Sequence, residues 1–166
     1  MCGKGFFCYV QKGRFVKLAI GADHGGFALK KIMMEFITGM GHDVMDCGAY
    51  SLEPGDDYPD FAGAVARAIQ QGQASRGILI CGSGVGAGVA ANKFEGIRAA
   101  VCHDVFSARQ GVEDDDMNVL CLGERIVGAG AAREAVRAFL NAGFSGAQRH
   151  LRRLNKVKSM ESEFFK

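Results

Sequence analysis

Short apolar runs rich in β-branched residues alternate with longer amphipathic stretches along most of the chain. Such runs are typical of buried parallel strands, and the stretches between them are typical of helices that cover both faces of a sheet. The pattern therefore predicts an α/β domain of three layers with a five-stranded parallel sheet. The expected strands are residues 16–22, 42–48, 77–81, 97–102 and 118–123.

The helices expected between and after these strands include one that extends beyond the sheet. The ordinary ones are residues 27–40, 58–71, a segment after the glycines of 82–88, 105–112 and 130–142. The last stretch, 145–165, predicts a projecting helix, because its apolar residues recur at helical spacing and suggest docking on another surface. These residues are Leu151, Leu154, Val157 and Met160. Residues 1–15 are interpreted as an N-terminal extension, and residues 16–166 as a single domain.

Length, charge and cysteine usage narrow the function classes. A chain of 166 residues suits one α/β domain and is too short for two. A formal net charge of +2 indicates neither a nucleic-acid nor a membrane partner, and no apolar stretch approaches membrane length. The six cysteines form no CxxC pair and no zinc-ligand spacing, which favours reduced thiols in the cytoplasm and no metal.

Residues with catalytic chemistry follow several of the expected strands. Asp23 and His24 follow the first, Cys81 ends the third, His103 follows the fourth and Arg125 the fifth. In open α/β sheets ligands bind beyond the carboxyl ends of the strands, so one crevice is expected to collect these residues.

The glycine-rich loop of residues 82–88 can turn backbone N–H groups toward an anion, although a tight turn that needs glycine for packing is the simpler alternative. Its GSGVGA also fits a dinucleotide-binding pattern. Here, however, the motif follows the third strand and does not open a first βαβ unit, and no ribose-binding acid falls convincingly about twenty residues on, so the dinucleotide interpretation is the less favoured one. Cys81 faces the same helix start, where a reactive thiolate is favoured, or it is a small buried hydrophobe. Cys47, Cys102 and Cys121 are expected to be core residues.

Other polar residues have two readings each. His24 could be a general acid or a phosphate ligand, or a satisfied histidine beside a capping aspartate. Arg149 and Arg153, four apart with His150 between them, could bind a phosphate dianion or belong to a solvated basic helix. Tyr58 could line a sugar site or cover core.

Five segments together resemble the ribose-5-phosphate isomerase B family, which also includes galactose-6-phosphate and allose-6-phosphate isomerases. They are GADHGGFALK, DYPDFA, GILICGSGVGAGVAANKFEGIRAAVC, NVLCLGERIVG and QRHLRR, and the similarity runs from about Val16 to beyond His150. The resemblance implies a Rossmann-like domain that forms homodimers, often paired into homotetramers, with active sites that borrow residues from the neighbouring subunit. It implies a sugar-phosphate substrate and no metal or organic cofactor.

The resemblance also implies roles for individual residues. Cys81 matches the base that moves a proton between C2 and C1 through a cis-enediolate, whereas other members carry an acid at the position of Gly86. Ser83 and the loop backbone, including Gly82, Gly84 and Gly86, would stabilise the oxyanion. The sugar- and phosphate-binding positions are matched by Asp23, His24, Tyr58, Asn92, Asn118, Arg125, Arg149, His150 and Arg153.

One departure from the family pattern concerns ring opening. Cysteine-base members commonly carry a histidine in an H-N-D-x-N segment, and Asp114 stands at its position here. His103 is the nearest alternative proton carrier and is predicted to take over this step. The leading function is interconversion of ribose 5-phosphate and ribulose 5-phosphate. Alternatives are isomerisation of a four- or six-carbon sugar phosphate, or non-catalytic sensing of a sugar phosphate.

Overall fold

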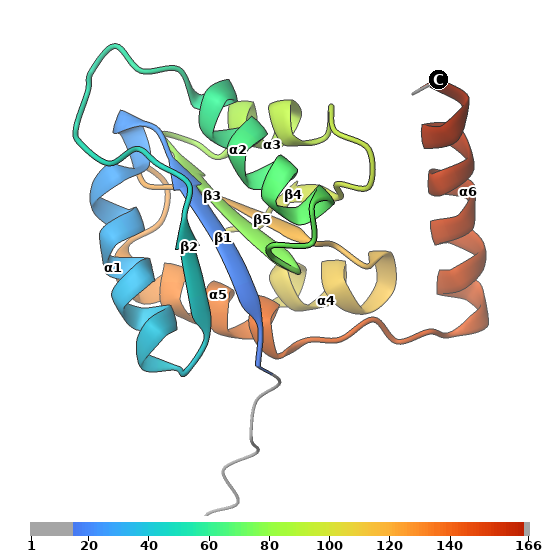
Figure 1. Ribbon diagram of the computed structural model, residues 1–166. Helices are drawn as coiled ribbons and strands as arrows, with labels where there is room; N and C mark the ends of the chain where they lie inside the picture. The colour runs from blue at the N-terminus through green and yellow to red at the C-terminus, as the bar shows by residue number, and fades with distance from the viewer. Residues whose placement is uncertain (1–14, 165–166) are drawn as a thin grey trace, which may run out of the picture.

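The computed structural model describes residues 15–164 and contains the predicted parallel sheet (Figure 1). Its strands are β1 (Lys17–Ala22), β2 (Asp43–Asp46), β3 (Arg76–Cys81), β4 (Ala99–Val101) and β5 (Val119–Gly123). All four neighbouring pairs are parallel, and the order across the five-stranded sheet is β2-β1-β3-β5-β4. Strands β2 and β4 are shorter than residues 42–48 and 97–102, because they are the two edge strands and each pairs on one side only.

Helices cover both faces of this sheet, which confirms the three predicted layers (Figure 1). They are α1 (Phe27–Gly39), α2 (Tyr58–Gln70), α3 (Val85–Ala91), α4 (Val105–Asp115) and α5 (Ala129–Asn141), with a short 3-10 turn, η1 (His24–Gly26), before α1. Helices α1, α4 and α5 share one apolar core with the sheet, and α2 and α3 share the other. The expected N-terminal extension lies, apart from Phe15, outside the described residues.

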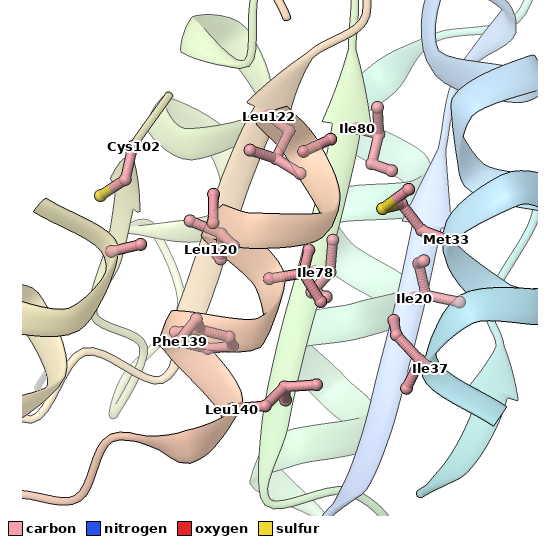
Figure 2. Packing of buried hydrophobic residues seen from close by; sticks show 14 of the residues in the cluster. Ile20, Met33, Ile37, Ile78, Ile80, Cys102, Leu120, Leu122, Phe139 and Leu140 are labelled. Carbon is pink, nitrogen blue, oxygen red and sulfur yellow. The ribbon is translucent and has the colours of Figure 1, made fainter. Parts of the chain in front are cut away.

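Alternate residues of the central strands point into the two cores. Ile20, Ile78 and Leu120 lie under α1 and α5 (Figure 2), whereas Leu79 and Cys121 lie under α2 and α3. These side chains are fully buried, and each of the four Ile and Leu side chains contributes about 1.5–3 kcal/mol of hydrophobic stabilisation. The sheet is therefore a rigid platform for the loops at its carboxyl end.

The remaining cysteines divide by burial. Cys102 is buried in the first core, as Cys121 is in the second, so both predictions are confirmed. Cys47 is only partly buried and packs at the margin of the second core. All four described cysteines, including Cys81, are free thiols.

Helix α6 (Gln148–Phe164) stands beside the sheet and is the predicted projecting helix (Figure 1). It touches α4, its Leu154 is buried, and its Glu161 accepts a hydrogen bond from the Gly96 N–H at 2.7 Å. Val157 and Met160 line a largely apolar groove of about 530 Å³ between α6 and the body of the domain and remain more than half exposed. None of the described helices has the length and apolarity needed to cross a membrane.

Candidate active site

Cys81 is held at the point where β3 turns into α3. Gly84 makes that turn with a φ of +83°, a left-handed conformation that favours glycine, and its N–H donates to the Cys81 sulfur at 3.0 Å. The thiol is buried among the side chains between the sheet and α2. A backbone donor at a helix start stabilises a thiolate, so this cysteine differs from the other buried cysteines in having a polar partner suited to a base.

A pocket of about 300 Å³ opens beside this sulfur. It is lined by Asp23, Tyr58, Cys81, Gly82, Ser83, Gly86, Arg125 and Ile126. Residues after β1, β3 and β5 thus meet at the carboxyl end of the sheet, as the strand order allows. Backbone bonds tie two of these loops together, since the N–H groups of Glu124 and Arg125 donate to the carbonyl oxygens of Cys81 and Gly82.

Asp23 presents an unsatisfied acid to this pocket. The residue is only 7% exposed, and its side-chain Oδ1 is buried without a hydrogen-bond partner among residues 15–164. Burial raises the pKa of the Asp23 carboxyl, which the neighbouring His24 partly offsets. A hydroxyl group of a bound sugar would satisfy Oδ1, and a carboxyl with a raised pKa can exchange protons with it more readily than an ordinary aspartate.

His24 is oriented by Asp56, a residue that the sequence analysis did not single out. One Asp56 carboxylate oxygen lies 2.7 Å from His24 Nδ1 and accepts the His24 backbone N–H at 2.9 Å. The two residues are 32 positions apart, in the turn after β1 and the loop before α2. The only signal in the sequence is the acidic GDDYP segment, whose reach back to β1 no local pattern reveals.

Tyr58 and Gly86 fit against each other. A Cβ atom on Gly86 would lie 2.8 Å from the Tyr58 ring, so an acidic side chain at position 86 fits only if that ring moves. Two N–H groups of the loop are used internally, those of Gly84 and Val85, the second donating to Ser83 Oγ at 3.3 Å. The remaining donors at the start of α3 are those available to a ligand.

His103 lies outside the residues that line the pocket and makes a bond to the backbone. Its Nε2 accepts the Gly123 N–H at 3.0 Å, which fixes that nitrogen as an acceptor. This bond joins β4 to β5 and does not support the predicted role in ring opening. Asn92 and Asn118 likewise brace the backbone. Asn92 exchanges two bonds with Ala99, and Asn118 bonds the Gly96 carbonyl and the Arg98 N–H.

A second polar cluster joins the end of α4 to the start of α6. His150 Nδ1 lies 2.7 Å from Ser145 Oγ and 3.3 Å from an Asp114 carboxylate oxygen, while Arg149 Nε donates to His150 Nε2 at 2.7 Å. Arg153 lies one turn further along α6 and is exposed. Helix α4 runs back along the sheet, so Asp114 lies about 14 Å from the helix start, toward the amino ends of the strands. Within one chain, this cluster and Cys81 are not brought together.

Comparisons with known proteins place the chain in a family. Residues 18–157 match the Ribose/Galactose Isomerase family. Ribose-5-phosphate isomerase B of Escherichia coli (strain K12) is 43% identical over 145 residues, which cover 87% of this chain and 96% of that protein. D-erythrulose-4-phosphate isomerase of Pectobacterium atrosepticum is 40% identical over 134 residues, 79% of this chain and 86% of that protein.

A solved structure agrees with these sequence matches. Ribose-5-phosphate isomerase B of Clostridium thermocellum superposes with a TM-score of 0.86 at 44% identity, covering 89% of this chain and 99% of that one. Sequence and fold therefore agree over almost the whole described domain, and the chain belongs to the Ribose/Galactose Isomerase family of isomerases.

Proposed function

We propose that this protein interconverts ribose 5-phosphate and ribulose 5-phosphate, with Cys81 as the base. The observation that carries the proposal is the Cys81 sulfur, bonded to the Gly84 N–H and lining a pocket with Asp23, whose Oδ1 is buried without a hydrogen-bond partner among the described residues. Escherichia coli ribose-5-phosphate isomerase B, at 43% identity, supports the substrate pair. The free thiols suit a reducing compartment such as the cytoplasm.

The proposed reaction moves two protons and no net electrons. The Cys81 thiolate removes the proton from C2 of the open-chain aldose, and the resulting thiol returns it to C1 of the cis-enediolate. A second proton passes from the hydroxyl on C2 to the oxygen on C1, and Asp23, whose burial raises its pKa, is placed to carry it. Ser83 and the unused N–H groups from Gly82 to Gly86 stabilise the enediolate oxygen. This scheme needs no metal or organic cofactor.

The phosphate requires cations from more than one subunit in this proposal. Arg125 lines the pocket of its own chain, whereas Arg149 and Arg153 belong to the cluster at the far end of the sheet. A homodimer, alone or within a homotetramer, would bring the α6 arginines of one chain to the Cys81 pocket of the other. The partly exposed apolar side of α6, with Val157 and Met160, is the surface through which we expect that association.

A four-carbon sugar phosphate is a second candidate substrate, because the residue at the family's ring-opening position and its predicted substitute both make other bonds. Asp114 is engaged by His150 and by Gln110 Nε2, and His103 Nε2 is bound to Gly123. A substrate too short to form a stable ring needs no such group. The Pectobacterium atrosepticum relative is a D-erythrulose-4-phosphate isomerase, which agrees with this alternative.

Coupled assays with four-, five- and six-carbon aldose phosphates test both candidates. The highest kcat/KM with ribose 5-phosphate supports the first, and a clear preference for the four-carbon substrate replaces it with the second. If the protein binds sugar phosphates but turns none of them over, the remaining interpretation is a non-catalytic sensor of a sugar phosphate. A parallel NAD titration tests the dinucleotide pattern, for which we expect no binding.

A further inference from the structure

Asp56 holds both the backbone and the ring of His24. Its Oδ1 accepts the His24 N–H at 2.9 Å and lies 2.7 Å from Nδ1 of the same residue. The Asp56 side chain is 12% exposed and that of His24 is 35% exposed. The contact fixes the turn after β1 and the direction of the imidazole together, with Nδ1 toward the carboxylate and Nε2 away from it. No bond engages Nε2 within residues 15–164.

The second Asp56 oxygen is not used by the fold. Oδ2 is buried and has no hydrogen-bond partner in the described part of the chain. A buried carboxylate selected for stability alone normally has both oxygens satisfied, because an unpaired one costs free energy. An acid that commits one oxygen to a histidine nitrogen is the usual arrangement for orienting a functional imidazole and for stabilising its charged form.

The charges around His24 act in the same direction. The hydrogen bond that the Asp56 carboxylate accepts from the His24 ring raises the pKa of His24, and the charges of Asp23 and Asp56 add to this effect, against the opposing influence of burial. Strand β3 and α1 pack on this turn, and the atoms nearest to its two glycines on this side are uncharged: a Cβ on Gly26 would meet Ile80, and one on Gly25 would meet the backbone of Gly82. Asp23 and Asp56 are thus the charged groups that face the ring among the described residues.

We propose that Asp56 is a positioning residue that keeps His24 as an imidazolium, with Nε2 free to donate a hydrogen bond to an oxygen of the anionic substrate. The inference rests on the proposed function, because the anionic substrate is the group that this cation would bind. Neither residue is among those that line the pocket of about 300 Å³, but His24 directly follows Asp23, which does line it, and its ring is 35% exposed. Asp56 acts through His24.

Asp56→Asn and Asp56→Ala separate orientation from charge. An asparagine can still accept both His24 N–H bonds but carries no charge, whereas alanine removes both. The kcat/KM of Asp56→Asn should match that of wild type near pH 5.5, where His24 is protonated in either protein. As the pH rises, kcat/KM should begin to fall at a lower pH in Asp56→Asn than in wild type. By pH 8 we expect the kcat/KM of Asp56→Asn to be clearly below that of wild type, because His24 then loses its proton more completely in the variant. Asp56→Ala should be impaired throughout this range.

Asp57→Asn is the matched control, because Asp57 is the exposed neighbour whose side chain makes no capping bond to α2. Its pH profile should coincide with that of wild type. If Asp56→Asn instead lowers kcat/KM by the same factor at every pH, Asp56 has only a structural role and the inference is overturned.

An NMR titration of the His24 ring tests the same point without turnover. Its midpoint should lie above 6.5 in wild type, the reference value for histidine, and move down in Asp56→Asn. Equal midpoints in the two proteins would overturn the inference whatever the activity. A protein that shows the shift but does not isomerise ribose 5-phosphate overturns the proposed substrate alone.

Discussion

Cys81 is distinguished at the residue scale by its partner and not by its burial. Cys81 and Cys121 are both buried in the same core, but burial raises the pKa of the Cys121 thiol to about 12, which makes it inert, whereas Cys81 accepts the Gly84 N–H. A sulfur with a backbone donor and an opening to a pocket can act as a base; one without them is a small hydrophobe.

Cys81→Ala should lower kcat by about 10³-fold, the range typical of a lost general base, and should leave KM near its wild-type value, because the thiolate acts mainly in the transition state. Steady-state kinetics with ribose 5-phosphate measure both quantities. Cys47→Ala is the control, since Cys47 is partly buried and outside the pocket, and it should retain wild-type kcat. Substantial kcat in Cys81→Ala would remove it from the mechanism.

The bond between His103 and the Gly123 backbone favours a structural role for this histidine over the ring-opening role predicted from its place after a strand. Its Nε2 bond to the Gly123 N–H predicts that His103→Ala destabilises the domain by about 1 kcal/mol, the usual value of a hydrogen bond, and slows five- and four-carbon substrates equally. Denaturant unfolding and paired kinetics measure the two effects. A selective loss with ribose 5-phosphate would instead restore the ring-opening role.

Single residues also show what sequence reasoning could not reach. Residue type and strand ends led to Asp23 and Cys81, because ligands bind where parallel strands end. Asp56 was missed because its contact with His24 spans 32 positions. Lys30 was missed too: it is buried and donates to Asp46 and to the Ala49 carbonyl, while neighbouring Lys31 is exposed. Only the fold decides which of two adjacent lysines turns inward.

At the scale of elements, period and composition predicted every strand of the sheet and its covering helices, because buried runs and amphipathic faces are local properties. The order of the strands was not predicted, and β5 lies between β3 and β4. Runs buried on both faces look alike in sequence, so their neighbours depend on long-range packing. The predicted bounds of the two edge strands are too long for the same reason, since a strand ends where its pairing with a neighbouring strand ends.

Helix α3 offers a matched pair of glycines for a test of the pocket. A Cβ on Gly86 would meet the Tyr58 ring at 2.8 Å, whereas one on Gly88 would lie at an ordinary 3.5 Å from Cys121 Sγ. Gly86→Ala should therefore push the Tyr58 ring and raise KM about threefold to tenfold, equivalent to roughly 1 kcal/mol of binding, with little change in stability. Gly88→Ala should leave KM unchanged and stabilise the helix by up to about 1 kcal/mol.

Kinetics and thermal unfolding of the two glycine variants separate these effects. Equal KM values in the two variants would mean that the contact between Tyr58 and Gly86 does not shape the substrate site. Because both substitutions replace glycine with alanine in the same short helix, propensity alone cannot produce a difference in KM.

At the scale of the whole molecule, the proposed site is divided between two ends of the domain. Cys81 lies at the carboxyl end of the sheet, and the cluster of Arg149 and His150 lies beside the far end of α4. Asp114, which holds the cluster, lies about 14 Å along α4 from the start of that helix at the carboxyl end of the sheet, farther than an arginine side chain reaches. A complete site in this proposal therefore needs two chains, in the reciprocal arrangement that two-fold symmetry provides.

Subunit mixing tests this arrangement directly. Cys81→Ala and the double variant Arg149→Ala, Arg153→Ala should each be nearly inactive with ribose 5-phosphate, the first through kcat and the second mainly through KM, because the phosphate is held far from the reacting carbons. When the two variants are co-expressed with different tags, random pairing makes about half of the dimers mixed. One site in each mixed dimer then combines an intact Cys81 with intact arginines, so activity should return to about a quarter of wild type.

The control pairs wild type with a chain that carries all three substitutions. Neither site of that mixed dimer is complete, so the control shows how much activity comes from the wild-type dimers alone. A mixture as inactive as its parents, in which tag pull-down confirms mixed dimers, would show that each chain builds its site from its own residues.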